Sequence, residues 1–174
     1  MESACFEARM KRERILKMSD FENLKNTALK RICEDWILCT EPYELERAKT
    51  LLSPLVRIFH KEISENPLPL IYIYRQSEQL PENQKSDGNL YRETNKSGNL
   101  IYCCLGISTE ALQQGKEYTA LVFMHELAHV NFPDHDNNFH EHLNNLISLY
   151  NIITGSTVKN DYYGLSKKEK LLMK

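Results

Sequence analysis

Apolar residues recur at helical spacing in two stretches of the first third of the chain. The first stretch covers residues 20–39 and would bury one face that includes Ile32 and Trp36. The second begins at Pro42, because proline suits the first turn of a helix, and Pro54 should kink or restart it. We therefore predict two leading helices, of which the second carries these apolar positions: Leu45, Ala48, Leu52, Leu55, Val56 and Phe59.

Three shorter segments are typical of β-strands, because they are rich in aromatic and β-branched residues. The first is 70–74, and a polar stretch that ends at Gly88 separates it from the next. The others are 89–93 and 99–105, and the sequence of residues 95–98 between them is typical of a hairpin turn. The pattern predicts a small antiparallel sheet of about three strands.

Two further helices are predicted in the second half, at residues 116–130 and 137–153, and the latter ends near Gly155. The fold class is therefore α+β, with the sheet packed on helices. We expect one domain over residues 19–155, a frayed or loosely packed N-terminal segment at 1–18, and a tail at 156–174.

Composition supports one ordinary globular domain, since 41% of the 174 residues are hydrophobic and 26% are charged. The net charge of −2 provides no overall basic field that would attract nucleic acid. There is no signal-peptide pattern and no apolar run of membrane-spanning length, so we expect a cytoplasmic protein that does not bind membranes. The number of cysteines is odd, so we expect their thiols to be in the reduced state and to have a structural role: Cys5, Cys33, Cys39, Cys103 and Cys104.

The third predicted helix contains the pattern HExxH, formed by His125, Glu126 and His129. Histidines four residues apart lie on one helix face, so both imidazoles can bind one zinc ion. The glutamate between them is placed to act as general base on a zinc-activated water. The pattern therefore predicts a catalytic zinc site with Glu126 as the catalytic residue.

A catalytic zinc requires a third protein ligand and an open fourth position, and His135 is the best candidate. On an unbroken helix it would face elsewhere, so residues 131–133 must turn the chain back, as Asn131 and Pro133 allow. We expect Asp136 to cap the last helix or to orient a histidine, and His142 to lie on the surface. The competing third ligands are Asp134, Asp136, His140 and Glu141, although His140 is also expected on the surface.

The residues from His125 to Phe139 read HELAH, five residues, then HDNNF, and this pattern resembles that of the WLM metallopeptidases and their SprT-like, Spartan-related relatives. The resemblance covers about residues 70–150, and only 118–143 carries specific motifs. It implies a minimal zincin fold, one Zn²⁺ per chain held by His125, His129 and His135, and Glu126 as base. Metzincins fit less well, because they carry a glycine where this chain has Phe132.

The function expected from these residues is hydrolysis of peptide bonds in a protein or peptide substrate by a zinc metallopeptidase. A second candidate is a DNA-associated protease that acts on DNA–protein crosslinks, as the relatives do. This chain, however, shows neither a basic field nor a zinc knuckle. A catalytically silent zincin-fold binding module and a different zinc hydrolase, such as an amidase, are also compatible with the motif.

Two finer expectations concern the substrate. The strand at 99–105 should form the sheet edge along which an extended peptide pairs. A phenol could stabilise the oxyanion, and the candidates for this role are Tyr150, Tyr162 and Tyr163.

Overall fold

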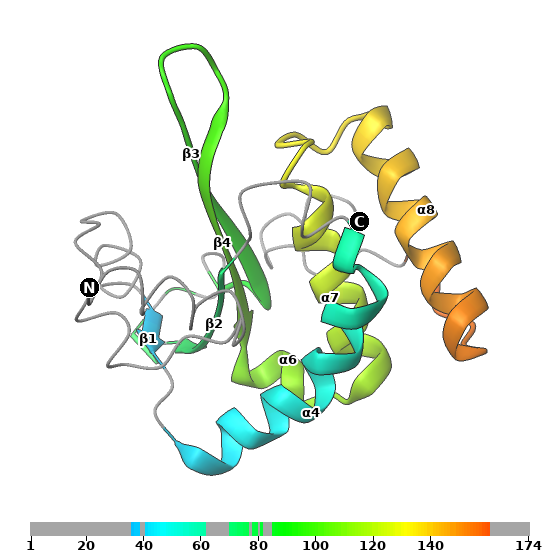
Figure 1. Cartoon of the computed structure of the whole chain (residues 1–174). Helices are drawn as coiled ribbons and strands as arrows, with labels where there is room; N and C mark the ends of the chain where they lie inside the picture. The colour runs from blue at the N-terminus through cyan, green and yellow to red at the C-terminus, as the bar shows by residue number, and fades with distance from the viewer. Residues whose placement is uncertain are drawn as a thin grey trace, which may run out of the picture.

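A computed structural model describes residues 36–38, 41–61, 70–76, 78–79, 81 and 85–160. Within these residues, four helices pack beside a four-stranded sheet, and the β3–β4 hairpin projects beyond the helices (Figure 1). The strands are β1 (Trp36–Leu38), β2 (Leu70–Gln76), β3 (Gly88–Thr94) and β4 (Leu100–Ser108). The helices are α4 (Pro42–Ile58), α6 (Thr109–Gln113), α7 (Lys116–Ala128) and α8 (Asn137–Thr154).

The sheet has the strand order β1-β2-β4-β3, and it is mixed rather than antiparallel. β2 and β4 pair in parallel, whereas β1 and β3 pair antiparallel with β2 and β4 respectively. The prediction of an antiparallel sheet is therefore wrong, although the α+β class and the β3–β4 hairpin are confirmed. The hairpin turn has Gly98 at φ 82°, and its amide donates to the Asn95 carbonyl at 3.0 Å.

β4 lies in the middle of the sheet and β3 at its edge, which reverses the predicted role of residues 99–105. The physical reason is the composition of β4, in which Cys104 and Leu105 point to opposite faces and are both fully buried. A strand that is apolar on both faces gains more from a central position than from an edge.

The predicted helix over residues 20–39 is wrong where the structure describes it. Residues 36–38 form β1, which pairs with the end of β2, and the remainder of that helix lies outside the described residues. The helix was predicted from the helical spacing of apolar residues, but Trp36 and its two apolar neighbours are equally typical of a strand. The predicted N-terminal segment at 1–18 also lies outside the described residues.

α4 begins at Pro42, as predicted, and continues through Pro54 as one helix, so of the predicted kink or restart at Pro54 the restart does not occur. Its buried face consists of Ala48, Leu52 and Leu55, together with Phe59 just beyond the helix. This face packs against α7 and α6. None of the described helices is both long and apolar enough to cross a lipid bilayer.

α7 is the central helix, since it contacts β3, β4, α4, α6 and α8 (Figure 1). Every residue from Thr119 to Ala128 is buried. A helix that is apolar on all sides belongs in a core, so the burial of His125 and Glu126 in its last turns is the exception that points to chemistry.

α8 follows α7 after a turn and ends at Gly155, whose left-handed conformation (φ 70°) closes the helix as predicted. The chain then runs back along α8, where the Asn151 side chain bonds both the amide and the carbonyl of Val158 at 3.0 Å. Part of the segment assigned to the tail thus packs on the domain. Residues 161–174 lie outside the described residues.

Candidate metal centre

α7 presents two histidines on one face, because residues four positions apart lie one above the other on a helix. The ring centroids of His125 and His129 are 4.9 Å apart. His125 is 4% exposed, whereas His129 caps the helix and is half-buried. Two imidazoles therefore project together from the C-terminal end of the helix.

The chain turns back directly after α7, as predicted. The amide of Phe132 donates to the carbonyl of Ala128 at 3.1 Å, and Pro133 cannot continue the helix. Arg92 of β3 braces the turn, since its Nε donates to the Val130 carbonyl at 3.0 Å. The bonded turn carries the next histidine back toward the helix.

His135 returns from this turn to meet the other two histidines. The Nε2 atoms are 3.2 Å apart between His125 and His129, 3.0 Å between His129 and His135, and 3.1 Å between His125 and His135. Nitrogen ligands at about 2.0–2.1 Å from a tetrahedral zinc lie roughly 3.3 Å from one another. The three nitrogens thus form a nearly equilateral triangle of a size that fits one metal ion.

A backbone carbonyl selects the tautomer of one of these histidines. Nδ1 of His129 lies 2.9 Å from the carbonyl oxygen of Phe132, which can only accept a hydrogen bond. The ring proton is therefore on Nδ1, and the Nε2 lone pair is directed at the other two imidazoles. Metal-bound histidines in proteins are oriented by the same kind of bond.

Phe139 packs against all three imidazoles. Its ring centroid is 5.0 Å from that of His125, 4.4 Å from that of His129 and 4.9 Å from that of His135. Asp136 fixes its place, because Oδ1 accepts the Phe139 amide at 2.9 Å and caps α8. The capping prediction for Asp136 is confirmed, and through this cap Asp136 places Phe139 against the three imidazoles.

The environment keeps His125 neutral. Its pKa is lowered from 6.5 to about 2, mainly by burial and in addition by the neighbouring His129, His135 and His140. A neutral imidazole is the form that binds a metal, so this histidine is ready to bind at any pH near neutrality.

The residues that competed with His135 as third ligand are not part of the cluster: Asp134, Asp136, His140 and Glu141. In the described parts of the chain, the group of side chains close enough to share one ion contains His125, His129 and His135 alone. The surface prediction for His140 and His142 is wrong, because both are half-buried. Their rings pack on two aromatic residues, with the His140 centroid 5.2 Å from that of Phe139 and the His142 centroid 5.3 Å from that of Phe132.

Glu126 follows the first histidine but points to a different neighbour. It is 3% exposed, and its side chain lies directly against Gly88 at the start of β3. A buried carboxylate that follows the first of three converging imidazoles on the same helix is a candidate for general-base chemistry.

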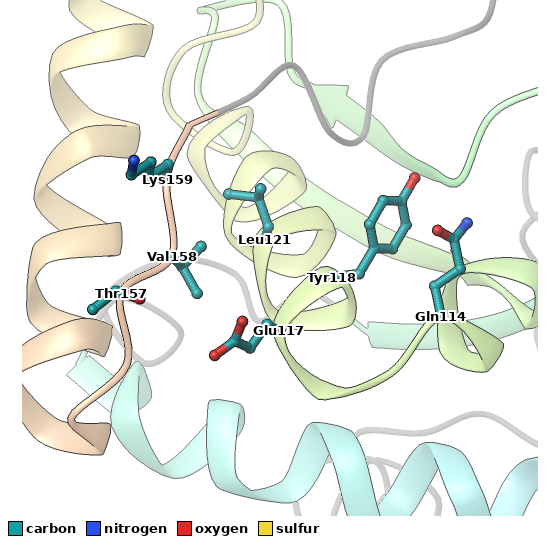
Figure 2. Close-up of a pocket in the computed structure, with 7 residues that line it drawn as sticks. All are labelled: Gln114, Glu117, Tyr118, Leu121, Thr157, Val158 and Lys159. Atoms are coloured by element: carbon teal, nitrogen blue, oxygen red, sulfur yellow. The ribbon is translucent and has the colours of Figure 1, made fainter.

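An open cleft of about 420 Å³ lies at the other end of α7 (Figure 2). The metal-centre residues do not line this cleft. Its walls come from the beginning of α7, the residue after α6 and the segment after α8: Gln114, Glu117, Tyr118, Leu121, Thr157, Val158 and Lys159.

The structure does not support Tyr150 as an oxyanion stabiliser. Its side chain is 1% exposed and belongs to the core of α8. It lies eleven helical positions beyond Phe139, which corresponds to about 16 Å along the axis. The remaining two candidates, Tyr162 and Tyr163, lie outside the described residues.

Sequence reasoning found the three histidines and Glu126 but missed the residues of β3 that reach the same helix. Gly88 and Arg92 are more than thirty positions from their partners on α7 and the turn after it, so no local pattern signals them. Comparisons with protein-family models, with curated proteins and with solved structures find no match for this chain.

Proposed function

We propose that this protein is a zinc-dependent metallopeptidase that hydrolyses peptide bonds with Glu126 as the general base. One observation carries the proposal. Three imidazole Nε2 atoms converge within 3.2 Å of one another, and a buried glutamate follows the first of them on the same helix. Three protein ligands leave a fourth position open, which distinguishes catalytic from structural zinc sites.

The residues of the site have separable roles. His125, His129 and His135 would hold the ion through Nε2. When bound, zinc supplies a Lewis acid that polarises the substrate carbonyl and lowers the pKa of a coordinated water to about 7. Glu126 accepts a proton from the attacking water on its carboxylate and delivers it to the nitrogen of the departing amine. The Phe132 carbonyl keeps His129 in the required tautomer throughout.

A minimal zincin fold of the WLM and SprT-like kind is part of the proposal. The order of elements supports it, because α4 leads into the sheet, the sheet into α7, and a tight turn into α8. The His135–Phe139 motif supports it as well, since each of its three defining residues has a specific contact in the site.

The substrate path suggested by the structure follows β3 rather than β4. β3 is an edge strand, and α7 packs against it, so its outer side can pair with an extended peptide next to Glu126. The proposal that a peptide pairs with the sheet thus remains, but it moves to the strand that contacts the base.

The experiment combines metal analysis with one pair of matched variants. The purified protein should contain one zinc per chain, and it should cleave casein or a generic peptide. Glu126→Gln should retain zinc and lose at least about 100-fold in cleavage rate. Glu117→Gln, an exposed glutamate on the same helix, should cleave at the parent rate.

Two results would contradict the proposal. Protein that contains zinc but cleaves no substrate, with or without Glu126, would identify a binding module instead of an enzyme. Protein that takes up no zinc when the metal is supplied would remove the basis of the mechanism.

A further inference from the structure

Gly88 occupies a place where no side chain fits. A Cβ built on it would lie 2.6 Å from Val122 Cγ1, 2.9 Å from Glu126 Cγ and 3.1 Å from Glu126 Oε1. Its backbone is not in the left-handed region, unlike that of Gly98, Gly115 and Gly155. The position therefore requires glycine because of its neighbours and not because of its conformation.

The neighbours form a stripe on α7. Tyr118, Val122 and Glu126 are four residues apart and lie on one face of the helix. The Tyr118 hydroxyl donates to the Asp87 carboxylate, and the other two side chains contact Gly88. Three successive turns of α7 thus rest on two adjacent residues, Asp87 and Gly88.

The segment that carries these two residues is fixed by bonds from other strands. The amide of Ser108, at the end of β4, donates to the Asp87 carbonyl at 2.9 Å. The amide of Ser86 donates to Gln76 Oε1 at 2.8 Å, and the buried Tyr74 hydroxyl donates to the Ser86 carbonyl. The segment around Gly88 is bonded to β2, β4 and α7, so moving it would break these bonds. A methyl group added at position 88 would therefore displace the flexible Glu126 side chain instead.

We infer that Gly88 is a positioning residue for Glu126, because the bare backbone at this point of β3 sets where the carboxylate of the base lies. The catalytic part of this inference rests on the proposed peptidase function. The contact itself does not, since it concerns two residues of the folded chain. A displacement of the carboxylate by about 1 Å is enough to reduce catalysis greatly while leaving the three imidazoles in place.

The contact is tested without any substrate by comparing thermal unfolding midpoints. Gly88→Ala should lower Tm in the parent protein and lower it clearly less in a Glu126→Ala background, where Glu126 Cγ and Oε1 are gone and Val122 Cγ1 is the remaining obstacle. Gly98→Ala, in an open turn with no atom within 4 Å of its Cβ, should lower Tm equally in both backgrounds. Equal losses from Gly88→Ala in both backgrounds would overturn the inference.

Catalysis then separates positioning from packing. Val122→Ala removes the closest obstacle, so Gly88→Ala/Val122→Ala should fold with α7 in place even if Gly88→Ala alone does not. We expect this double variant to bind one zinc, to keep KM within about twofold and to lose at least about tenfold in kcat relative to Val122→Ala.

The possible failures are distinguishable. A double variant with the kcat of Val122→Ala would show that the methyl group disturbs only helix packing, and the inference would fall. If the parent protein cleaves nothing, the proposed function fails instead, and the unfolding comparison still decides whether Gly88 limits the place of Glu126.

Discussion

The two ends of α7 differ in how they hold their polar groups. At the N-terminal end, the exposed Glu117 and Lys159 line an open cleft of about 420 Å³. At the C-terminal end, His125 and Glu126 are 4% and 3% exposed, and the His125 imidazole meets that of His135 from the returning turn. The cleft has separated, water-exposed charges, whereas the metal centre has atoms directed at one point.

This difference indicates that the better candidate for a functional site is the end of α7 where side-chain atoms converge, and not the end that has the open cleft. A nearby aromatic ring, a selected tautomer and a lowered imidazole pKa all occur at the metal end. Perturbed groups held in a fixed geometry are the usual mark of a functional site. Variants at the two ends therefore test the comparison directly.

The largest effect is expected from the third ligand. His135→Ala should weaken zinc binding by at least about 100-fold, because two imidazoles from one helix cannot enclose the ion. Lys159→Ala, at the cleft end, should bind zinc like the parent protein. Competition with a chromophoric chelator measures both affinities, and unchanged binding by His135→Ala would break the comparison.

Removal of the buried aromatic residue should affect both stability and metal. Phe139→Ala should lower the free energy of unfolding by about 3–5 kcal/mol and weaken zinc binding by about 10–100-fold. Leu121→Ala, which is 2% exposed and lines the cleft, should cost about 2–5 kcal/mol without changing zinc affinity. Denaturant unfolding measures the stability of both variants, and chelator competition measures their zinc affinity. An equal loss of zinc affinity in Phe139→Ala and Leu121→Ala would contradict this account.

The depressed pKa of His125 predicts a loss of stability in acid for the metal-free protein. The folded form has a pKa of about 2 against 6.5 unfolded, so the unfolded chain binds the extra proton between these values. Stability should be full above pH 6.5 and fall by up to about 1.4 kcal/mol per pH unit below it. Denaturant unfolding at pH 7.5, 6 and 5 measures this slope.

The matched control for the pH series is an exposed histidine just beyond α4. His125→Gln should flatten the acid slope of the unfolding free energy, and His60→Gln should leave it unchanged. A parent slope that survives His125→Gln would place the responsible group elsewhere.

The smallest expected effect comes from the helix caps. Asp136→Ala should lower the unfolding free energy by about 1 kcal/mol, and Ser108→Ala, which caps α6 near the cleft end, by a similar amount. Zinc affinity should fall only in Asp136→Ala, because that cap places Phe139 against the ligands. Equal affinities in the two variants would show that the cap does not act on the metal centre.

Much of the fold followed from local patterns. α4, the β3–β4 hairpin, α7 and α8 lie within a few residues of their predicted bounds, since each has its own periodicity and its own start or stop residue. The short α6 was missed, because five residues carry too little periodicity to detect. The parallel pairing of β2 with β4 was missed because strand order depends on contacts between distant segments.

Local residue order was enough to predict the three converging imidazoles. The helical repeat puts His125 and His129 on one face, and the proline after them brings the chain back with His135. Where the Glu126 carboxylate lies could be learned only from the packed fold, because Gly88 reaches it through a strand folded against the helix. Spacing along the chain fixes neighbours within a helix, whereas neighbours across a core depend on how whole elements pack.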